Sequence, residues 1–194
     1  MAVAVQRFTL EEYLKYDDGE DGRYELVDGE LIPMSLGTGQ HGRAMSCAEK
    51  RLRQEIDQEE RPWIAEKGII GVQSPRGTRW DTVRIPDVVV MLAEQWDGME
   101  NREAVILLNE PPPLLVVEVV SESTKRVDYR SKLSEYAVLD ISEYWIVDPL
   151  RERVTICVLV DGLYDQVVFA GEEAIASTVF PNLTMTAAQI LAGR

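Results

Sequence analysis

Apolar and polar residues near the start of the chain predict a short helix followed by a β-hairpin. Thr9 and Glu12 form a capping-box pattern ahead of apolar residues, so a first helix is expected to run to about Asp17. Two strand-like runs follow, and the dipeptide Asp28-Gly29 between them readily adopts the positive φ angles of a tight turn. The two runs are Arg23–Val27 and Glu30–Ser35.

The middle of the chain changes from helical to strand-like spacing. From about Gln40 to Glu60, apolar residues recur every four positions with charged residues on the other faces, which indicates an amphipathic helix. Apolar, β-branched runs then predict strands suited to the centre of a sheet, and turn-rich or proline-rich segments separate them. These runs are Trp63–Ser74, Ile85–Leu92 and Leu114–Val120.

The last third of the chain combines a second long helix with a second hairpin. Asp128–Leu139 carries an apolar stripe at helical spacing and leads into the strand-like run Tyr144–Val147. A second hairpin is predicted next, from two strand-like runs around the turn dipeptide Asp161-Gly162, namely Val154–Val160 and Tyr164–Phe169. A short helix around Thr186–Leu191 closes the chain. Since no repeat or linker is visible, we expect one α/β domain over residues 1–194, with a mixed central sheet flanked by helices.

The composition is that of a folded protein, which we expect to stay in the cytoplasm. The 194 residues include 45% hydrophobic and 28% charged residues, which is ordinary for a globular chain. No apolar run approaches the roughly 18 residues that a membrane-spanning helix needs, and Met1–Leu10 lacks the features of a signal peptide. Cys47 and Cys157 lie far apart in the sequence, which favours reduced thiols over a disulfide framework.

Histidine content and charge exclude several kinds of function. His41 is the only histidine, so a zinc site built from several histidines is excluded. The net charge of −14 repels polyanions at long range, which argues against a protein that coats nucleic acid through a broad basic surface. A local basic groove remains compatible with that charge.

Two carboxylates interrupt apolar runs and give the clearest chemical signal in the sequence. Asp87 lies within Pro86–Met91, and Glu118 lies within Leu114–Val120. A buried charge is costly without a partner, so each acid needs a cation, a basic side chain or a raised pKa. A shared Mg²⁺ or Mn²⁺ ion would satisfy both, because such ions bind through one or two carboxylates plus water and phosphate oxygens. From the residues alone, structural ion pairs at the strand ends are the slightly better explanation.

An ordered set of motifs between Tyr24 and Pro149 resembles the PD-(D/E)XK nucleases. Pro86-Asp87, the later Glu118 in an apolar strand and a downstream lysine are similar to the signature of that superfamily. The more specific resemblance is to the Uma-type restriction endonucleases of bacteria. It is carried by Tyr24–Glu30, Glu118–Thr124, Asp128, Lys132, Tyr136 and Glu143–Pro149. The resemblance favours a metal site over structural ion pairs.

The resemblance implies a restriction-endonuclease-like core that hydrolyses DNA phosphodiester bonds with Mg²⁺ or Mn²⁺. Asp87 and Glu118 are the implied metal ligands, Lys132 would lie beside the attacking water, and Glu25 would assist. DNA is the implied partner, and a homodimer is expected because cutting two strands calls for two sites. One position departs from the superfamily pattern, since Val120 stands where a lysine would share a strand face with Glu118.

The lysine of the site must therefore come from elsewhere in the chain. The resemblance points to Lys132 on the following helix, with Lys125 in reserve, and a lysine there would orient the water or neutralise phosphate charge. Taken without the resemblance, Lys132 is explained as a surface partner of Asp128 four residues earlier. Glu25 is equally explained as part of a solvated edge strand.

Gly37–Gly42 has the glycine spacing of a dinucleotide-binding loop and lies between a predicted strand and a predicted helix. That strand belongs to a hairpin, however, and the acid expected about 20 residues later would fall inside the long helix. A flexible glycine loop is the better interpretation of this segment.

Two groups of basic residues are candidates for contact with a phosphate backbone. The first group lies on the long helix and comprises Arg43, Lys50, Arg51 and Arg53. Because several acidic residues lie among them, a solvated helix surface is the favoured interpretation of this group. The second group leads directly into Asp87 and is the better candidate, and it comprises Arg76, Arg79 and Arg84.

The sequence thus leaves three functions to compare. The first is a metal-dependent endonuclease. The second is a nuclease-like domain that binds nucleic acid or a protein without cutting, which Val120 favours. The third is dinucleotide binding at Gly37–Gly42.

Overall fold

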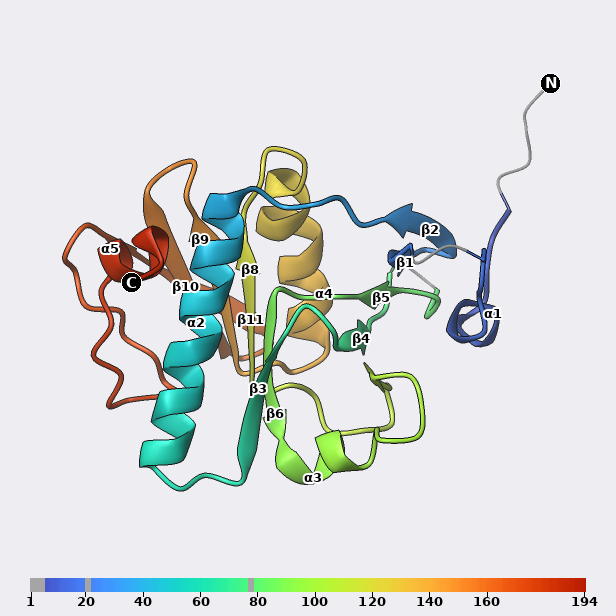
Figure 1. Ribbon diagram of the computed structural model, residues 1–194, viewed down its shortest axis with the longest axis horizontal. Coiled ribbons are helices and arrows are strands. Elements are labelled where there is room, and N and C mark those ends of the chain that lie inside the picture. The colour runs from blue at the N-terminus through green and yellow to red at the C-terminus, as the bar shows by residue number, and fades with distance from the viewer. Residues whose placement is uncertain (1–5, 20–21, 77–78) are drawn as a thin grey trace.

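The computed structural model describes residues 6–19, 22–76 and 79–194 and has a mixed α/β fold with a large sheet at its centre (Figure 1). Within these residues the strand order of the large sheet is β11-β10-β9-β8-β6-β3, with β8 and β9 parallel and the other pairs antiparallel. Its strands are β3 (Trp63–Lys67), β6 (Val88–Leu92), β8 (Leu115–Val119), β9 (Glu143–Asp148), β10 (Arg153–Val160) and β11 (Leu163–Ala170). A parallel pair needs a crossover connection, and the helix after β8 supplies it.

A smaller sheet carries the N-terminal hairpin and has the order β2-β1-β5-β4-β7 in the described part of the chain. Its strands are β1 (Tyr24–Val27), β2 (Glu30–Pro33), β4 (Gly71–Gln73), β5 (Val83–Arg84) and β7 (Val105–Ile106). Asp28 and Gly29 have φ angles of 52° and 81°, which confirms the predicted tight turn. The capping box of Thr9 is also present, but helix α1 (Leu10–Leu14) ends before Asp17.

One predicted strand is divided between the two sheets and another is shorter than predicted, which the sequence pattern did not reveal. The run Trp63–Ser74 breaks at Gly68, where a φ of 61° turns the chain from β3 into β4. The run Ile85–Leu92 forms a strand only from Val88, as β6, because Pro86 has no N–H to donate to a ladder; the unpredicted strand β5 lies just before the run. Helix α3 (Ala93–Asp97) and the short strand β7 were not predicted.

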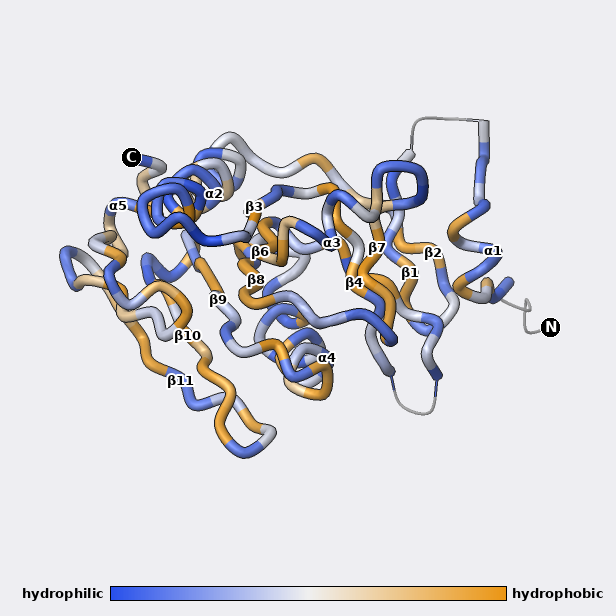
Figure 2. Tube along the Cα trace, turned by 90° about the horizontal axis from the view of Figure 1, so that it is seen from below, coloured by the Kyte–Doolittle hydropathy of each residue, from blue (hydrophilic) through white to orange (hydrophobic). Residues whose placement is uncertain are grey.

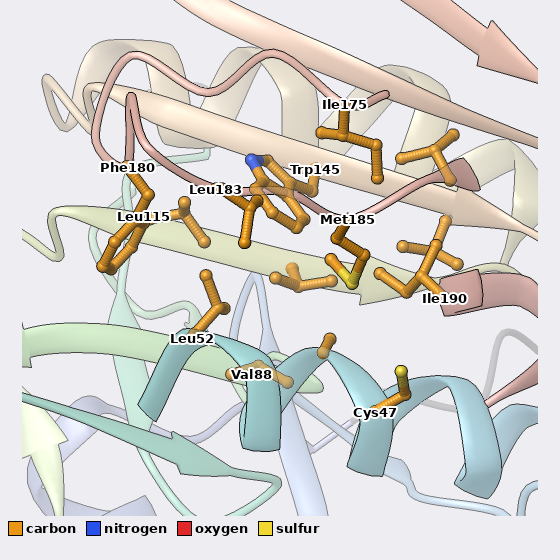
Figure 3. Packing of buried hydrophobic residues seen from close by; sticks show 14 of the residues in the cluster. Cys47, Leu52, Val88, Leu115, Trp145, Ile175, Phe180, Leu183, Met185 and Ile190 are labelled. Atoms are coloured by element: carbon orange, nitrogen blue, oxygen red, sulfur yellow. The ribbon is translucent and has the colours of Figure 1, made fainter. Parts of the chain in front are cut away.

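Helices cover both faces of the large sheet. On one face α2 (Gly39–Gln58) packs Leu52 and Cys47 toward Leu115 and Trp145 (Figure 3). On the other face lies α4 (Lys132–Val138), which follows the π-helical turn η1 (Val127–Ser131) and contributes Tyr136 to a second core cluster. The closing helix α5 (Ala187–Ala192) packs beside α2 (Figure 1). The expected mixed sheet flanked by helices is therefore confirmed.

Burial and hydropathy follow the strands. Residues facing α2 and residues facing α4 alternate along β6 and β8, as expected for strands buried on both faces. Figure 2 shows hydrophobic stretches along β10 and β11, whose hairpin projects from the rest of the molecule. Cys47 and Cys157 are buried and form no disulfide. Among the residues described, no helix is both apolar and long enough to span a bilayer.

Candidate active site

The pairing of β6 with β8 brings the two predicted metal-binding acids together. Val88 lies opposite Val117 in the antiparallel register, and one step further along that register Asp87 lies opposite Glu118, on the same side of the sheet. The backbone N–H of Val119 donates a hydrogen bond of 2.6 Å to Oδ2 of Asp87. The expectation that these two strands are neighbours is confirmed.

Lys132 enters the same cluster from the first residue of α4. Its Nζ lies 2.7 Å from Oε2 of Glu118, 3.3 Å from Oδ1 of Asp128 and 3.9 Å from Oε1 of Glu25. Burial alone would lower the pKa of the ammonium, but the charges of Glu118 and its neighbours outweigh it and raise that pKa. Lys132 therefore stays protonated inside the cluster.

The departure at Val120 has a packing explanation. Val120 is 3% exposed and belongs to the core cluster that contains Val116 and Tyr136, so a lysine at this position would place its charge in the core beneath α4. The helix after β8 supplies the ammonium instead. The reserve candidate Lys125 points elsewhere, because its exposed side chain pairs with Glu122 at 2.9 Å.

Glu118 occupies the most enclosed position of the cluster. Its Oε1 accepts a hydrogen bond of 2.7 Å from the hydroxyl of Tyr136. Burial raises the pKa of Glu118 to about 8, and although Lys132 acts in the opposite direction, the nearby carboxylates of Asp128 and Asp87 raise it further. Glu118 thus lies in surroundings that oppose its negative charge.

Asp128 is a fourth acid of the cluster, and sequence reasoning treated it only as a partner of Lys132. The turn η1 brings its side chain inward, where the residue is 1% exposed, with Lys132 and Thr124 as its polar neighbours. Its contact with Lys132 is an ion pair of 3.3 Å. Burial raises the pKa of Asp128 despite that ion pair. The four-residue spacing to Lys132 was the signal that could have found it.

Glu25 lies at the edge of the cluster and is tied to a second network. Its Oε2 accepts a hydrogen bond of 3.0 Å from Arg84, and its Oε1 accepts one of 3.0 Å from the N–H of Ile85. Arg84 is also held by two hydrogen bonds to Glu135, at 2.7 and 3.0 Å. Glu25 is thus mostly buried and anchored, which differs from the solvated edge strand considered as its alternative.

His41 adds a contact that sequence reasoning did not assign. Its Nε2 lies 2.9 Å from Oδ1 of Asp87, and this hydrogen bond raises the pKa of the imidazole. The glycine segment before α2 positions it, because Thr38 caps the helix by accepting a hydrogen bond from the N–H of His41. The strands before and after α2 belong to different sheets, unlike the parallel pair of a dinucleotide-binding unit.

The arginines that precede Asp87 are already paired with acids. Arg84 is buried between Glu25 and Glu135, and Arg79 contacts Asp81 and Asp28 at 3.0 and 3.3 Å. Arg76 lies 3.7 Å from Glu135, and residues 77–78 lie outside the described part of the chain. Arg76 and Arg79 keep 42% and 37% of their side chains exposed, so contact of this segment with a substrate stays a prediction.

The donor set fits a hard divalent cation that would share its coordination sphere with a substrate. Glu118, Asp128 and Glu25 converge on the Lys132 ammonium, and the charge of nearby Asp87 acts on Glu118. In the part of the chain that the structure describes, no group of three or more His, Cys, Asp or Glu side chains forms a preformed metal cage. Mg²⁺ needs no such cage, because it keeps several waters and binds one or two carboxylates plus substrate phosphates.

Comparisons with known proteins identify the family and the fold of the chain. An uncharacterised protein of Synechocystis is 26% identical over 164 residues, which cover 79% of this chain and 82% of the relative. A crystal structure of "a putative nuclease belonging to DUF820" from Anabaena variabilis has a TM-score of 0.74 at 17% identity, covering 96% of this chain and 98% of the other. The family model Uma2, described as "Putative restriction endonuclease", matches residues 10–188. Because that match spans nearly the whole sequence, the chain belongs to the Uma2 family.

Proposed function

We propose that this protein is an endonuclease that hydrolyses phosphodiester bonds of DNA with the help of Mg²⁺ or Mn²⁺. One observation carries the proposal, namely the position of the Lys132 ammonium 2.7 Å from Glu118, an acid on which the charge of Asp87 also acts. Two acids with an adjacent lysine are the groups that metal-assisted phosphodiester hydrolysis needs. Family membership supports the same reaction class.

Each residue of the cluster has a distinct part in this proposal. Asp87 and Glu118 would hold the cation, and Asp128 adds a third carboxylate close to it. When bound, a divalent metal ion acidifies a coordinated water and neutralises charge on the phosphoryl oxygens. Lys132 would orient the attacking water and donate a hydrogen bond to a phosphate oxygen. His41 and the N–H of Val119 hold the Asp87 carboxylate in place.

Cleavage of supercoiled plasmid DNA and of a labelled duplex tests this proposal. We expect purified protein to cut with Mg²⁺ or Mn²⁺, and the Glu118→Gln and Lys132→Met variants to lose roughly a hundredfold or more in rate. Glu122→Gln is the matched control, because Glu122 is exposed and pairs with Lys125 outside the cluster. If wild type and Glu118→Gln leave every DNA form equally intact, the proposed activity is wrong.

A non-cutting binding module is the second candidate, and one observation favours it. Every carboxylate oxygen of Asp87 and Glu118 already has a partner within the protein, namely His41, Val119, Tyr136 or Lys132. Carboxylate oxygens can accept a second contact, so the arrangement permits a metal ion without requiring one.

Calorimetric titration with Mn²⁺ separates the two candidates. Binding that Asp87→Ala abolishes would favour the enzyme. An absence of Mn²⁺ binding, together with DNA binding that survives in Asp87→Ala, would favour the module. Glu122→Gln again provides the control with one carboxylate fewer at the surface.

A further inference from the structure

Strand β11 forms an open edge of the large sheet. In the described part of the chain it pairs only with β10, and Figure 2 shows the hairpin of these two strands projecting from the rest of the molecule. Leu163, Val167 and Val168 are 74%, 55% and 51% exposed. The opposite edge differs, because β3 is mostly half-buried beside α2 and α3.

The sequence of β11 lacks the features that protect a sheet edge from pairing with another chain. Protected edges usually carry lysines, a proline or a bulge. Residues 163–170 include neither lysine, arginine nor proline, and their register with β10 runs without interruption. Asp165 is the only charged residue among them, although 28% of the whole chain is charged. The edge is therefore open to β-pairing and offers no cation to a phosphate backbone.

The turn before β11 determines which of its backbone groups face outward. Asp161 and Gly162 have φ angles of 49° and 79°, and Val160 lies opposite Leu163 in the register. In a hairpin with such a two-residue turn, the first pair exchanges backbone hydrogen bonds, and so does every second pair after it. The odd-numbered residues of β11 thus bond to β10, and the even-numbered residues direct their N–H and C=O groups away from the sheet.

The last outward-facing residue of β11 already has a partner. Ala170 donates its N–H to Oε2 of Glu173 at 2.7 Å and accepts a hydrogen bond of 3.1 Å from the N–H of Glu173. Among residues 6–19, 22–76 and 79–194, no such partner is found for the outward N–H and C=O groups of Tyr164, Gln166 and Val168. The open stretch therefore runs from Tyr164 to Val168, with Gln166 at its centre.

We propose that β11 pairs antiparallel with β11 of a second copy of the chain, about a two-fold axis at Gln166. The interface goes beyond the proposed function and does not depend on it. A two-fold axis places the same surface on both copies, so the strand must complement itself. Gln166 would lie opposite its own counterpart, and Tyr164 opposite Val168 of the partner subunit. Each pair exchanges two backbone hydrogen bonds, and an aromatic side chain meets a β-branched one.

Charge and the bond to Glu173 disfavour the neighbouring registers. An axis at Asp165 would place two like charges directly opposite each other, which is destabilising. An axis at Val167 would place Tyr164 opposite Ala170 of the partner subunit, whose outward backbone groups are bonded to Glu173. An axis at the residue between Asp165 and Val167 avoids both conflicts.

Analytical ultracentrifugation tests the interface. One pair of strands is a small interface, so we expect reversible dimerisation of the 21.9-kDa chain with a Kd on the order of 10 µM. Gln166→Pro should stay monomeric up to about 200 µM, because it removes an outward N–H and leaves the ladder with β10 intact. Gln166→Thr keeps that N–H and should dimerise as wild type does.

Disulfide cross-linking tests the register. In a hydrogen-bonded antiparallel pair the Cα atoms are about 5.5 Å apart, a distance that a disulfide spans. Gln166→Cys should therefore give a covalent dimer under mild oxidation. Leu163→Cys is the control, because Leu163 is exposed on the same strand but lies away from the axis, and it should give none. The native Cys47 and Cys157 are buried.

A wild type that stays monomeric up to about 200 µM would overturn the proposal. So would a dimer that survives Gln166→Pro, or one that cross-links through Leu163→Cys and not through Gln166→Cys. If Gln166→Pro does not fold, Gln166→Lys replaces it, and like charges at the axis should weaken the dimer about fivefold or more.

The dimer and the endonuclease fail separately. β9 and β10 lie between β11 and the acid cluster beside β8, so monomeric Gln166→Pro should bind Mn²⁺ as wild type does. A dimer that cuts no DNA refutes the endonuclease alone, and a monomer that cuts DNA refutes the interface alone.

Discussion

Asp128 and Glu25 both lie near Lys132, but their surroundings give them different parts. Glu25 is satisfied by Arg84 and by the N–H of Ile85. Burial raises the pKa of Asp128 even though Lys132 lies 3.3 Å away, so the charge of Asp128 is only partly compensated. At the residue scale we therefore propose that Asp128 contributes to metal binding and that Glu25 is structural.

A matched pair of substitutions tests this assignment. Glu25→Gln should lower the free energy of unfolding by about 1–2 kcal/mol, because it weakens charged hydrogen bonds to Arg84 and Ile85. Asp128→Asn should leave that free energy unchanged or raise it, while the Kd for Mn²⁺ weakens by about 10- to 100-fold. Urea unfolding and calorimetry measure the two quantities. If instead Glu25→Gln weakens Mn²⁺ binding and Asp128→Asn lowers the free energy of unfolding, Glu25 is the third acid of the metal site, as the sequence suggested.

The sequence identified most residues of the cluster, but for unequal reasons. Asp87 and Glu118 stand out because each interrupts an apolar run, which burial cost makes conspicuous. Lys132 could be named only through family resemblance, since a lysine four residues after an acid is ordinary on a helix surface. His41 gave no signal of its own, because its contact with Asp87 depends on how α2 lies over the sheet.

At the scale of elements, a buried glutamate fastens the last loop of the chain to β9. Glu143 is fully buried and accepts hydrogen bonds from the side chains of Trp145, Ser177 and Thr178 and from the backbone N–H groups of Thr178 and Val179. The loop that it holds carries Phe180 into the core beside α2. A carboxylate that accepts so many hydrogen bonds stabilises the packing of an element rather than the reaction.

Glu143→Ala should therefore destabilise the protein without acting on the site. We expect a loss of about 3–5 kcal/mol in the free energy of unfolding, because buried donors lose their acceptor. Urea unfolding measures this loss. Glu172→Ala, at an exposed position of the same loop, should change it by less than about 0.5 kcal/mol. Mn²⁺ affinity of the folded Glu143→Ala protein should match wild type, and a loss of affinity would place Glu143 in the functional network.

Long periodic elements were predictable, whereas the division of the strands between two sheets was not. The hairpin turns at Asp28-Gly29 and Asp161-Gly162 follow from local backbone chemistry, and all four residues have positive φ angles. The break at Gly68 has a local cause too, but which sheet each half joins depends on pairing with distant strands. Hydrophobic spacing carries no information on that choice.

At the scale of the whole molecule, metal binding should be measurable as thermal stability. Mg²⁺ or Mn²⁺ at about 100 times its Kd should raise Tm by roughly 5–10 °C, because an ion that binds only the folded chain stabilises it. Removal of the ion with EDTA should return Tm to its starting value. Asp87→Asn should show no shift, and an equal shift in that variant would mean that the ion binds elsewhere on this acidic protein.

The expected homodimer stays a prediction. The hairpin of β10 and β11 exposes Leu163, Val167 and Val168 along the edge of the large sheet (Figure 2). Apolar side chains on an unpaired edge strand are suited to contact with another copy of the chain.

The crowding of Glu118, Asp128 and Glu25 around Lys132 has a consequence for selection. Burial and the neighbouring carboxylates oppose the charged form of Glu118 despite Lys132, so keeping these acids lowers the stability of the metal-free protein. A directed-evolution screen for heat resistance in metal-free medium would therefore enrich amides at Glu118 and Asp128. The same screen with Mg²⁺ present would retain the acids. The two screens would therefore differ in the residues found at Glu118 and Asp128.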